Sequence, residues 1–368
     1  MKLTCNGTDL ADALAKVIKA LPVKKTQPIL EGVKLSAQGD TLTVYATDYD
    51  FAISKQMKAD VRMEGDVLVP GKLLNDLARK LASEDSIELS DITDDNLTIA
   101  YADSSTFLKT MSLAEYPPQK EYDYDVTLSL LQKDFRDMIN KTIFSAATDG
   151  ARPILKGCLL EVSDDEMRCV ALDGYRLAIC RKKLARSYDH FQAIVPAKSL
   201  MEISKLLDRD EEVVNLHLSA SRLMVDLGDT RVSASLLNGA FINYKNTVPS
   251  ELEITVTVNK QQLEDAIERA SILSRYEKSN LIRLEIKEGK MTIVSTSELG
   301  ESKEVISIFS KGKDITIGFN ARYVSDCLKA IDDEFVILRM NSATAPCVFT
   351  PVEGDDYLYL ILPIRIVR

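Results

Sequence analysis

Several aspartates of this chain could take part in metal-dependent chemistry. Asp48 and Asp50 stand two residues apart and Asp94 and Asp95 are adjacent, so either pair could hold a divalent ion for nuclease chemistry. Both pairs lie in turn-like sequence, and no constellation of histidine or glutamate surrounds them. A metal-dependent enzyme that processes nucleic acid is therefore the alternative hypothesis rather than the favoured one.

The stretch "GDVLVPGKLL" partly resembles a glycine-rich loop that binds phosphate. Gly65 and Gly71 have five residues between them where that motif needs four, and Leu73 stands where it needs serine or threonine. The chain also lacks GxSxG, HExxH and any paired Cys–His arrangement. We therefore expect no catalytic residue, no metal site and no cofactor.

The stretch "RCVALDGYRLAICRKK" (168–183) places an aspartate, a glycine, a tyrosine and an arginine between two apolar runs. One interpretation is an ordinary Asp-Gly turn that joins two buried strands. The other is a surface on which a peptide docks. The residues alone leave both interpretations open, so the rest of the chain has to decide between them.

Length and composition describe a soluble protein of more than one domain. The chain has 368 residues, 45% of them hydrophobic and 28% charged. Its six cysteines are scattered without a CxxC pair, which is typical of reduced core thiols in the cytosol. The N-terminal residues do not resemble a signal peptide, and the most apolar run (357–364) is too short to cross a bilayer. We expect a cytoplasmic protein that does not contact a membrane.

One unit recurs three times along the chain. "QPILEGVKLSAQGDTLTVYATDYDFAI" from Gln27 and "RPILKGCLLEVSDDEMRCVALDGYRLAI" from Arg152 share Pro-Ile-Leu-x-Gly and an aspartate twenty residues after the proline. In the weaker third copy, "SNLIRLEIKEGKMTIVSTSELGE", Ser297 takes the place of Asp48 and Asp173. Three motifs that keep their order and spacing indicate three related domains, which we place at 1–121, 122–249 and 250–368.

Each copy shows the same order of expected elements. A short alternating strand leads into a helix, a second strand leads into a second helix, and alternating strands close the unit. Pro70 and Pro196 stand where a helix tolerates proline, and Asn320 is suited to be an N-cap. The pattern predicts an α+β fold with six helices, over 7–21, 70–82, 129–145, 196–209, 259–275 and 320–331.

Positive charge gathers in these helices. The whole chain has a net charge of −10, whereas the six spans together carry 16 Lys+Arg against 11 Asp+Glu, a balance of +5. Solvated helix faces in general explain part of this. If the six helices share one face, they also make a surface that attracts phosphates without reading sequence. Those basic residues are Lys16, Lys19, Lys72, Arg79, Lys80, Lys133, Arg136, Lys141, Lys198, Lys205, Arg209, Lys260, Arg269, Arg275, Arg322 and Lys329.

Four motifs together resemble a known family. "LDGYRLA" (172–178), "IVPAKSL" (194–200), "IGFNARYV" (317–324) and the ending "YLILPIRIV" (359–367) are similar to those of the bacterial sliding clamps, the β subunits of DNA polymerase III. With the triplicated domain, the resemblance covers the whole chain. It implies three tandem DNA-clamp domains, each with two helices packed on antiparallel sheets, and a head-to-tail homodimer that closes into a six-domain ring lined by twelve helices.

The resemblance also implies a function and partners. Such a ring is a non-enzymatic processivity factor that encircles double-stranded DNA and slides along it without sequence specificity. It tethers the α subunit of DNA polymerase III, the δ subunit of the clamp loader and repair proteins that carry a clamp-motif peptide. Because the ring must slide, a modest positive lining suits it better than a strong one.

In the family, peptides dock in a hydrophobic cleft between the second and third domains. By the resemblance, Leu177, Ile242, Leu362 and Pro363 would receive apolar anchors, and Arg176 or Asn320 would fix a peptide backbone or a glutamine. The full expected cleft comprises Leu155, Leu172, Gly174, Tyr175, Arg176, Leu177, Ile242, Asn320, Tyr323, Thr344, Pro346, Leu360, Leu362, Pro363, Ile364 and Arg365. Asp48 marks the same turn in the first domain, without a docking role.

Two further sets of residues follow from the resemblance. The expected DNA contacts are Lys24, Lys25, Lys72, Arg152 and Lys198. The expected dimer seam joins Phe107 and Leu108 of one subunit to Ile272 and Leu273 of the other, although a core role is an equal alternative for these four.

The chain departs from the family's pattern around the cleft. Tyr175 stands where many relatives have histidine, and Ile242 stands where others have proline after the phenylalanine. Asn246 and Thr247 occupy rim positions that are often arginine and valine. These departures bear on which peptides bind, not on whether the cleft exists.

Overall fold

The computed structural model describes residues 1–24, 27–92, 95–120, 122–150, 152–276 and 279–366. The chain forms two compact units, Met1–Gln132 with Lys205–Leu236, and Lys133–Ser204 with Leu237–Arg368. The second repeat is therefore shared between the units: its closing strands belong to the first and its long hairpin to the second.

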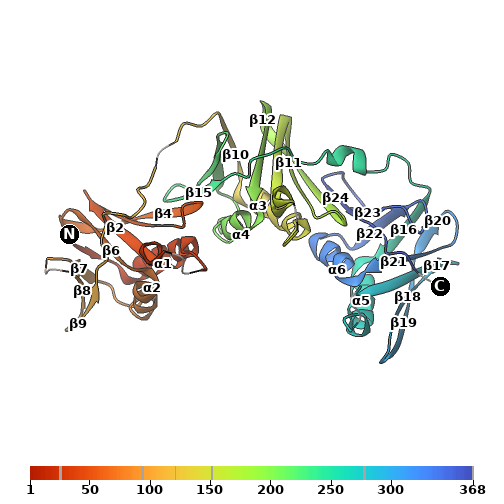
Figure 1. Ribbon diagram of the computed structural model, residues 1–368, viewed down its shortest axis with the longest axis horizontal. Helices are drawn as coiled ribbons and strands as arrows, with labels where there is room; N and C mark the ends of the chain where they lie inside the picture. Colours follow the sequence, from red (N-terminus) through yellow and green to blue (C-terminus); the bar gives the residue numbers. More distant parts are fainter. Residues whose placement is uncertain (25–26, 93–94, 121, 151, 277–278, 367–368) are drawn as a thin grey trace. The chain divides into compact units, whose positions relative to one another are not determined.

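The six predicted helices are confirmed. They are α1 Gly7–Val17, α2 Gly71–Lys80, α3 Gln132–Asn140, α4 Ala197–Ser204, α5 Lys260–Ser274 and α6 Ala321–Ala330 (Figure 1). The predicted N-cap is confirmed too, because Oδ1 of Asn320 accepts a hydrogen bond from the backbone N–H of Arg322 at 3.0 Å. Asn6 and Asn259 cap α1 and α5 in the same way.

Several predicted helical spans are longer than the helices. Residues 129–131 belong to β10, where they pair with β13, and two spans end in short 3-10 turns. Apolar spacing continues through these ends, so periodicity alone does not show where the α-helix stops. The 3-10 segments are η1 Ile18–Ala20, η2 Pro28–Glu31, η3 Ile143–Ser145, η4 Pro153–Lys156 and η5 Tyr244–Thr247.

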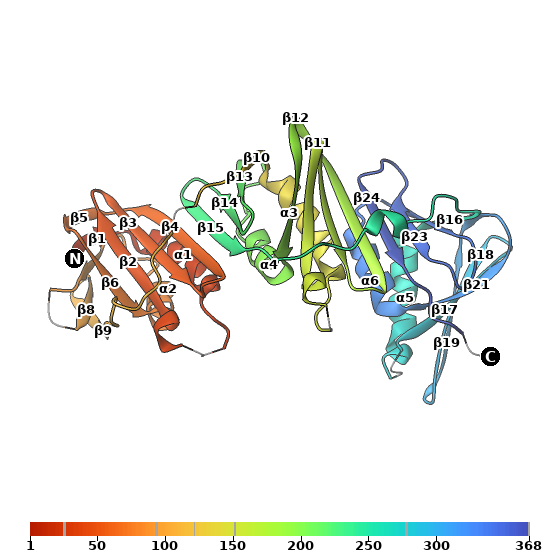
Figure 2. The same ribbon diagram turned by 45° about the horizontal axis from the view of Figure 1, so that its top comes forward.

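The first unit holds two antiparallel sheets. One has the strand order β5-β1-β7-β8-β9, and the other β10-β13-β14-β15-β4-β3-β2-β6 (Figure 2). Their bounds are β1 Lys2–Cys5, β2 Gly32–Gln38, β3 Thr41–Thr47, β4 Phe51–Lys58, β5 Asp60–Met63, β6 Gly65–Pro70, β7 Ile87–Ser90, β8 Asn96–Tyr101, β9 Ser104–Lys109, β10 Val126–Leu131, β13 Val213–Leu218, β14 Arg222–Asp226 and β15 Thr230–Ser235.

The second unit also holds two antiparallel sheets, of order β11-β12-β24-β23-β22-β16-β20 and β19-β18-β17-β21. The bounds are β11 Gly157–Leu172, β12 Arg176–Pro196, β16 Ile254–Asn259, β17 Leu281–Lys287, β18 Lys290–Ser297, β19 Gly300–Ser307, β20 Phe309–Lys311, β21 Ile315–Asn320, β22 Phe335–Met340, β23 Cys347–Pro351 and β24 Tyr357–Ile361.

Strand pairing runs across the boundaries between repeats. β4 of the first repeat pairs with β15, the last closing strand of the second, and β12 of the second repeat pairs with β24, the last closing strand of the third. By position in the repeat, β19 corresponds to β4 and β12, and β9 corresponds to β15 and β24. Among the described strands, β19 and β9 each lie at the end of a sheet.

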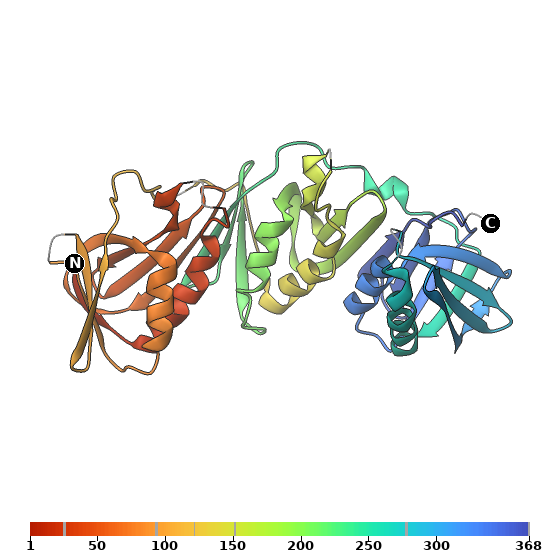
Figure 3. The ribbon, with the colours of Figure 1, turned by 60° about the horizontal axis from the view of Figure 1, so that its bottom comes forward.

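The helices lie side by side in pairs on their sheets. α1 packs against α2 in the first unit, and α5 against α6 in the second (Figure 3). Close packing of the first pair depends on Gly7: a Cβ there would lie 2.1 Å from the carbonyl oxygen of Leu81. All six cysteines are buried and unpaired, as predicted for core thiols. None of the described helices is long and apolar enough to span a membrane.

Candidate functional site

The Asp173 turn connects β11 to β12 and is closed by its own carboxylate. Oδ1 of Asp173 accepts hydrogen bonds from the backbone N–H of Tyr175 at 2.8 Å and of Arg176 at 3.1 Å. Gly174 has φ +96°, a region in which glycine has no steric penalty. The turn therefore presents Tyr175 to solvent, with 65% of its surface exposed.

The same turn recurs in the other two repeats. Oδ1 of Asp48 accepts from the backbone N–H of Asp50 at 3.2 Å and of Phe51 at 2.7 Å. Oγ of Ser297 accepts from the N–H of Leu299 at 3.2 Å. The correspondence predicted for these positions is confirmed, and the Asp48 carboxylate acts here as a turn former.

Arg176 follows the turn and is held from several sides. Its Nε donates to Oδ2 of Asp173 at 3.0 Å, and its Nη1 donates to Oδ2 of Asp326 at 2.6 Å. The guanidinium carbon lies 4.3 Å from the centre of the Tyr323 ring and 5.7 Å from that of Phe144. Only 8% of Arg176 is exposed, so this cation links the turn to α6.

The guanidinium of Arg176 stays protonated despite its burial. Burial disfavours the charged guanidinium, but the neighbouring Tyr359, Asp326 and Asp173 outweigh that effect and hold the pKa of Arg176 above its usual range. The hydroxyl of Tyr359 also donates to the carbonyl oxygen of Tyr323 at 3.1 Å. Sequence reasoning named Arg176 but missed Asp326 and Phe144, because residues this distant in sequence leave no local signal.

The expected cleft residues all belong to the second unit. Leu155, Leu172, Leu177 and Leu360 share one buried cluster, and Ile242 packs against it half-buried. Leu362 follows the cluster residue Leu360 by two positions and is 37% exposed. Of the remaining expected residues, Arg176 is buried, Gly174, Tyr175, Thr344 and Arg365 are exposed, and Asn320, Tyr323, Pro346, Pro363 and Ile364 are half-buried.

The C-terminal segment is fixed to the turn and to β21. The N–H of Leu362 donates to the carbonyl oxygen of Tyr175 at 2.8 Å, and the N–H of Ile364 donates to that of Gly318 at 2.8 Å. Gly318 permits this approach, since a Cβ there would lie 2.9 Å from the carbonyl oxygen of Ile364. The apolar residues after β24 are thus held beside the Asp173 turn.

A buried carboxylate holds the segment near the end of the second repeat. Glu161 in β11 accepts from the Tyr244 hydroxyl at 2.6 Å, from Lys245 Nζ at 3.1 Å, from Gln192 Nε2 at 2.9 Å and from Arg168 Nη1 at 3.2 Å. Burial works against the carboxylate, but these donors outweigh it and lower its pKa to about 2. The sequence signal that was missed is a glutamate inside the apolar run "CLLEV".

Two expected polar contacts are already used within the protein. Besides capping α6, Asn320 donates through Nδ2 to the carbonyl oxygen of Ser279 at 3.2 Å. Arg176 is occupied by the two carboxylates described above. Both side chains therefore position the elements that border the cleft.

The expected DNA contacts that the structure describes are exposed. Lys24 and Arg152 lie in loops, Lys72 in α2 and Lys198 in α4. Among the described residues no hydrogen-bond or ion-pair partner is seen for the side chains of these four. Lys25 lies outside the described residues.

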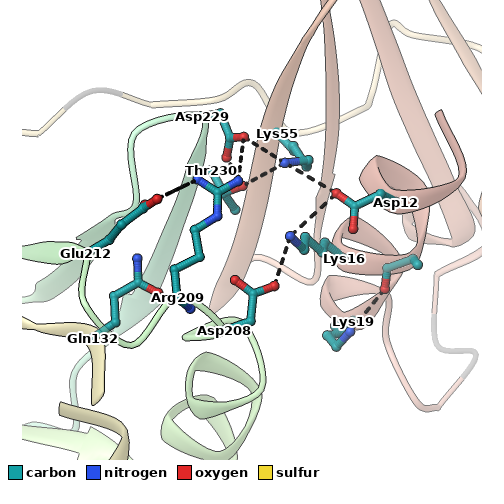
Figure 4. A network of polar contacts seen from close by, with 11 residues as sticks. Asp12, Lys16, Lys19, Lys55, Gln132, Asp208, Arg209, Glu212, Asp229 and Thr230 are labelled. Atoms are coloured by element: carbon teal, nitrogen blue, oxygen red, sulfur yellow. Dashed lines mark hydrogen bonds and ion pairs between the residues drawn. The ribbon is translucent and has the colours of Figure 1, made fainter. Parts of the chain in front are cut away.

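Other basic residues of the helices are neutralised locally. Lys16 of α1 lies 3.4 Å from Asp12 and 3.3 Å from Asp208 (Figure 4). In the same network Lys55 lies 3.0 Å from Asp229, and hydrogen bonds from Thr230 and Lys55 outweigh burial and lower the pKa of Asp229. Lys141, Arg209 and Arg269 also have carboxylate partners. Asp332, Glu212 and Glu304 lie outside the six predicted spans, so these three pairs offset positive charge beyond what the balance of +5 counts.

Comparison with known proteins shows to which family the chain belongs. The family models for the N-terminal, central and C-terminal domains of the DNA polymerase III beta subunit match residues 1–121, 129–243 and 245–365. The beta sliding clamp of Halalkalibacterium halodurans is 30% identical over 95% of each chain, and that of Vibrio cholerae 29% identical over the full length of both. The chain belongs to the bacterial sliding-clamp family.

Solved sliding clamps share the fold along the whole chain. A putative DNA polymerase III beta subunit from Eubacterium rectale matches with a TM-score of 0.95 and 28% identity over 100% of both chains. A sliding clamp from Pseudomonas aeruginosa, solved bound to griselimycin, matches with the same score, identity and coverage. The fold is thus that of three clamp domains, with helices packed on antiparallel sheets.

The positions at which this clamp departs from its family surround the cluster. Asn246 and Thr247 lie in η5 and are exposed, next to the anchored Tyr244 and Lys245. Ile242 packs on the cluster through an aliphatic side chain. Asn246 and Thr247 are thus exposed at the surface, whereas Ile242 takes part in the packing of the cluster.

Proposed function

We propose that the protein is the processivity clamp of a replicative DNA polymerase. Two copies join head to tail into a ring of six domains, with boundaries at 1–121, 122–249 and 250–368 in each chain, and twelve helices face the enclosed duplex. The ring works in the cytoplasm at the nucleoid. The observation that carries the proposal is strand pairing across the repeats, which leaves β9 and β19 at the ends of their sheets.

The pairing supplies a physical reason for the ring. In each junction within the chain, the strand after the recurring turn pairs with the last closing strand of the next repeat. Within residues 1–368, no repeat follows the one that holds β19, and none precedes the one that holds β9. Pairing β19 with β9 of a second copy continues the pattern, and a heterologous contact repeated in this way can close. Phe107, 64% exposed on β9, and Ile272, 58% exposed on α5, are apolar residues suited to that seam.

Enclosure explains why weak contacts with DNA suffice. A closed ring cannot leave a circular duplex, however weak its affinity for DNA. The lining therefore needs only weak phosphate contacts, which form and break as the ring slides. Exposed Lys24, Lys72, Arg152 and Lys198 supply such contacts. Phosphate contacts carry no sequence information, in agreement with sliding.

The cluster of the second unit is the proposed docking site for linear peptides of the polymerase α subunit, the clamp-loader δ subunit and repair proteins. Exposed Tyr175 and Leu362 border buried Leu177 and Leu360, which gives an apolar surface with a polar rim. The protein itself catalyses no reaction in this proposal. The alternative, a metal-dependent nuclease built on Asp48 and Asp50, is disfavoured because the Asp48 carboxylate already binds two backbone N–H groups.

The assembly is tested by its mass in sedimentation equilibrium. One chain has a mass of 40.9 kDa, and we expect the wild-type protein to sediment as a dimer. Phe107→Lys places a charge in the seam and should raise the dimer dissociation constant at least about tenfold. Ile92→Lys is the matched control, since Ile92 is 61% exposed in the same unit but off β9. A wild-type protein that stays monomeric at micromolar concentration contradicts the proposed ring.

A further inference from the structure

The first unit contains a pocket of about 850 Å³, apart from the proposed cleft of the second unit. Its lining residues come from β3, β4, β13, β14 and β15, from the Asp48 turn, and from residues 117–120, 122 and 124 of the connection between the first and second repeats. A smaller hollow of about 220 Å³ shares Tyr45, Ser54, Gln56, Gln119 and Arg231 with it. Because they share these residues, the two hollows adjoin and form one groove.

The groove occupies the position in the first junction that the proposed peptide cleft occupies in the second. β4 pairs with β15 as β12 pairs with β24, and each junction begins at the same aspartate turn. A shift of 125 residues carries Leu172, Gly174, Tyr175, Leu177 and Ile242 of the cleft onto Thr47, Tyr49, Asp50, Ala52 and Pro117. All five of the latter line the pocket.

The chemistry of this groove differs from that of the cleft. Aliphatic side chains give way to the rings of Tyr45, Tyr49, Tyr122 and Tyr124. Tyr49 has φ +76° where its counterpart in the second repeat is Gly174, and a bulky residue in that region is unusual and strained. Tyr49 is nevertheless 49% exposed, so its burial in the fold is only partial.

The Asp48 turn and two of the rings are held in place before any ligand arrives. Arg222 donates through Nη2 to the carbonyl oxygen of Tyr49 at 3.0 Å and through Nη1 to that of Asp50 at 3.3 Å. Its guanidinium carbon lies 5.2 Å from the centre of the Tyr122 ring. Tyr124 lies 5.5 Å, centre to centre, from the ring of His217. Such preorganisation lowers the entropy lost on binding.

The groove also offers polar groups to a ligand. Oγ of Ser233 is buried in its lining and has no hydrogen-bond partner among the described residues. Arg231 stands at the pocket with 55% of its side chain exposed, and its Nε lies 3.3 Å from Asp226. A peptide main chain would satisfy the hydroxyl, and a carboxylate of the ligand could pair with the solvent-facing guanidinium.

We propose that this groove is a second peptide-docking site, for an extended segment that inserts an aromatic or proline ring among the tyrosines and pairs a carboxylate with Arg231. That the ligand is a peptide rests on the peptide docking proposed for the second unit. That the groove is a binding site rests on the pocket alone. Tyrosines and arginines also stack on bases of single-stranded DNA. A DNA strand would bring a phosphate at every nucleotide past Asp50 and Asp226, which line the same pocket, whereas the proposed peptide needs only one carboxylate, placed at Arg231.

The test is selection of a random decapeptide library on the full-length protein. Affinities of the enriched peptides are then measured by fluorescence anisotropy for the wild type, for Arg231→Glu, for Tyr122→Ser and for the cleft variant Leu362→Ala with Pro363→Ala. We expect one class of peptides, rich in aromatic or proline residues and in aspartate or glutamate, that binds the two groove variants at least about tenfold more weakly and binds the cleft variant unchanged. Arg231→Lys should restore part of the affinity.

Each contrary result overturns the proposal. If all enriched peptides bind Arg231→Glu as well as they bind the wild type, the groove does not dock peptides, whatever the cleft variant shows. If only the cleft variant loses binding, the docking proposed for the second unit stands and the groove fails. If Tyr122→Ser weakens binding of a fluorescein-labelled oligothymidine instead, the groove serves single-stranded DNA. If Tyr122→Ser lowers the melting temperature, its weaker binding would only reflect a damaged fold. The affinities of Arg231→Glu and Arg231→Lys then test the proposal, because Arg231 is exposed.

Discussion

At the scale of single residues, polar side chains of this clamp mostly fix apolar segments in place. Arg176 ties the Asp173 turn to α6, and Glu161 ties Tyr244 and Lys245 to β11. Both charges are buried and paired with groups of opposite charge, the arrangement that a low-dielectric site requires. Tyr244, which Glu161 holds, is a member of the buried apolar cluster.

Glu161 makes stability depend on pH. Its folded pKa of about 2 lies below the usual value for a glutamate, so its contribution is complete above the unfolded pKa and is lost as the pH falls toward 2. Glu161→Gln should lower the free energy of unfolding by about 2–3 kcal/mol at pH 7, since each pKa unit corresponds to about 1.4 kcal/mol. Urea unfolding at pH 7 and at pH 3 checks this: the difference between variant and wild type should shrink at pH 3. A difference that is constant with pH contradicts the role given to the charge.

The cleft makes a separate prediction. Leu362→Ala with Pro363→Ala removes two apolar side chains beside the turn, and a peptide with the clamp-binding motif should then bind at least about tenfold more weakly. Dimer mass should not change, because both residues are distant in sequence from β9 and β19. Val352→Ala is the control: Val352 is 48% exposed in the same unit. Unchanged peptide affinity in the double variant would refute the assignment of the site.

At the scale of elements, close packing of helices sets limits that composition does not reveal. Gly7 begins α1, and its backbone N–H donates to the carbonyl oxygen of Glu84 at 3.0 Å. Replacing glycine by alanine in a helix usually stabilises a protein. Here the added Cβ would lie 2.1 Å from the backbone oxygen of Leu81, and backbone cannot move aside cheaply.

Gly7→Ala should therefore destabilise the fold, by about 1–3 kcal/mol. Chemical denaturation measures the free energy of unfolding. Ala15→Gly, in the same helix, gives the ordinary glycine cost of about 0.5–1 kcal/mol for comparison. A stabilised Gly7→Ala protein would mean that α1 and the segment after α2 pack less closely than described.

Elements with a local signature could be predicted, and pairings between them could not. The Asp48 and Asp173 turns and the Asn320 cap depend on side chains within three residues, so the sequence reveals them. Pairing of β4 with β15 is made by backbone groups far apart in sequence, and backbone hydrogen bonds carry no residue code. For the same reason the contact between Arg176 and Asp326 was missed.

At the scale of the whole molecule, charge and pairing have to be considered together. The repeats and their motifs suffice to place the chain in its family, and strand pairing supplies the reason why two copies would join. Local ion pairs such as Lys141 with Asp332 reduce the cationic surface that the composition of the helices suggests. A thin layer of exposed cations is what a ring that must slide requires, since each tight phosphate contact slows it.

Retention on DNA tests enclosure most directly. The protein is loaded onto a nicked circular plasmid with a clamp loader and ATP, freed of unbound protein by gel filtration, and divided in two. One half is linearised with a restriction enzyme. The account predicts that the protein stays with the circles at a salt concentration that abolishes ordinary phosphate contacts, and leaves the linear DNA within minutes. Equal retention on circular and linear DNA, or equal loss from both, contradicts it.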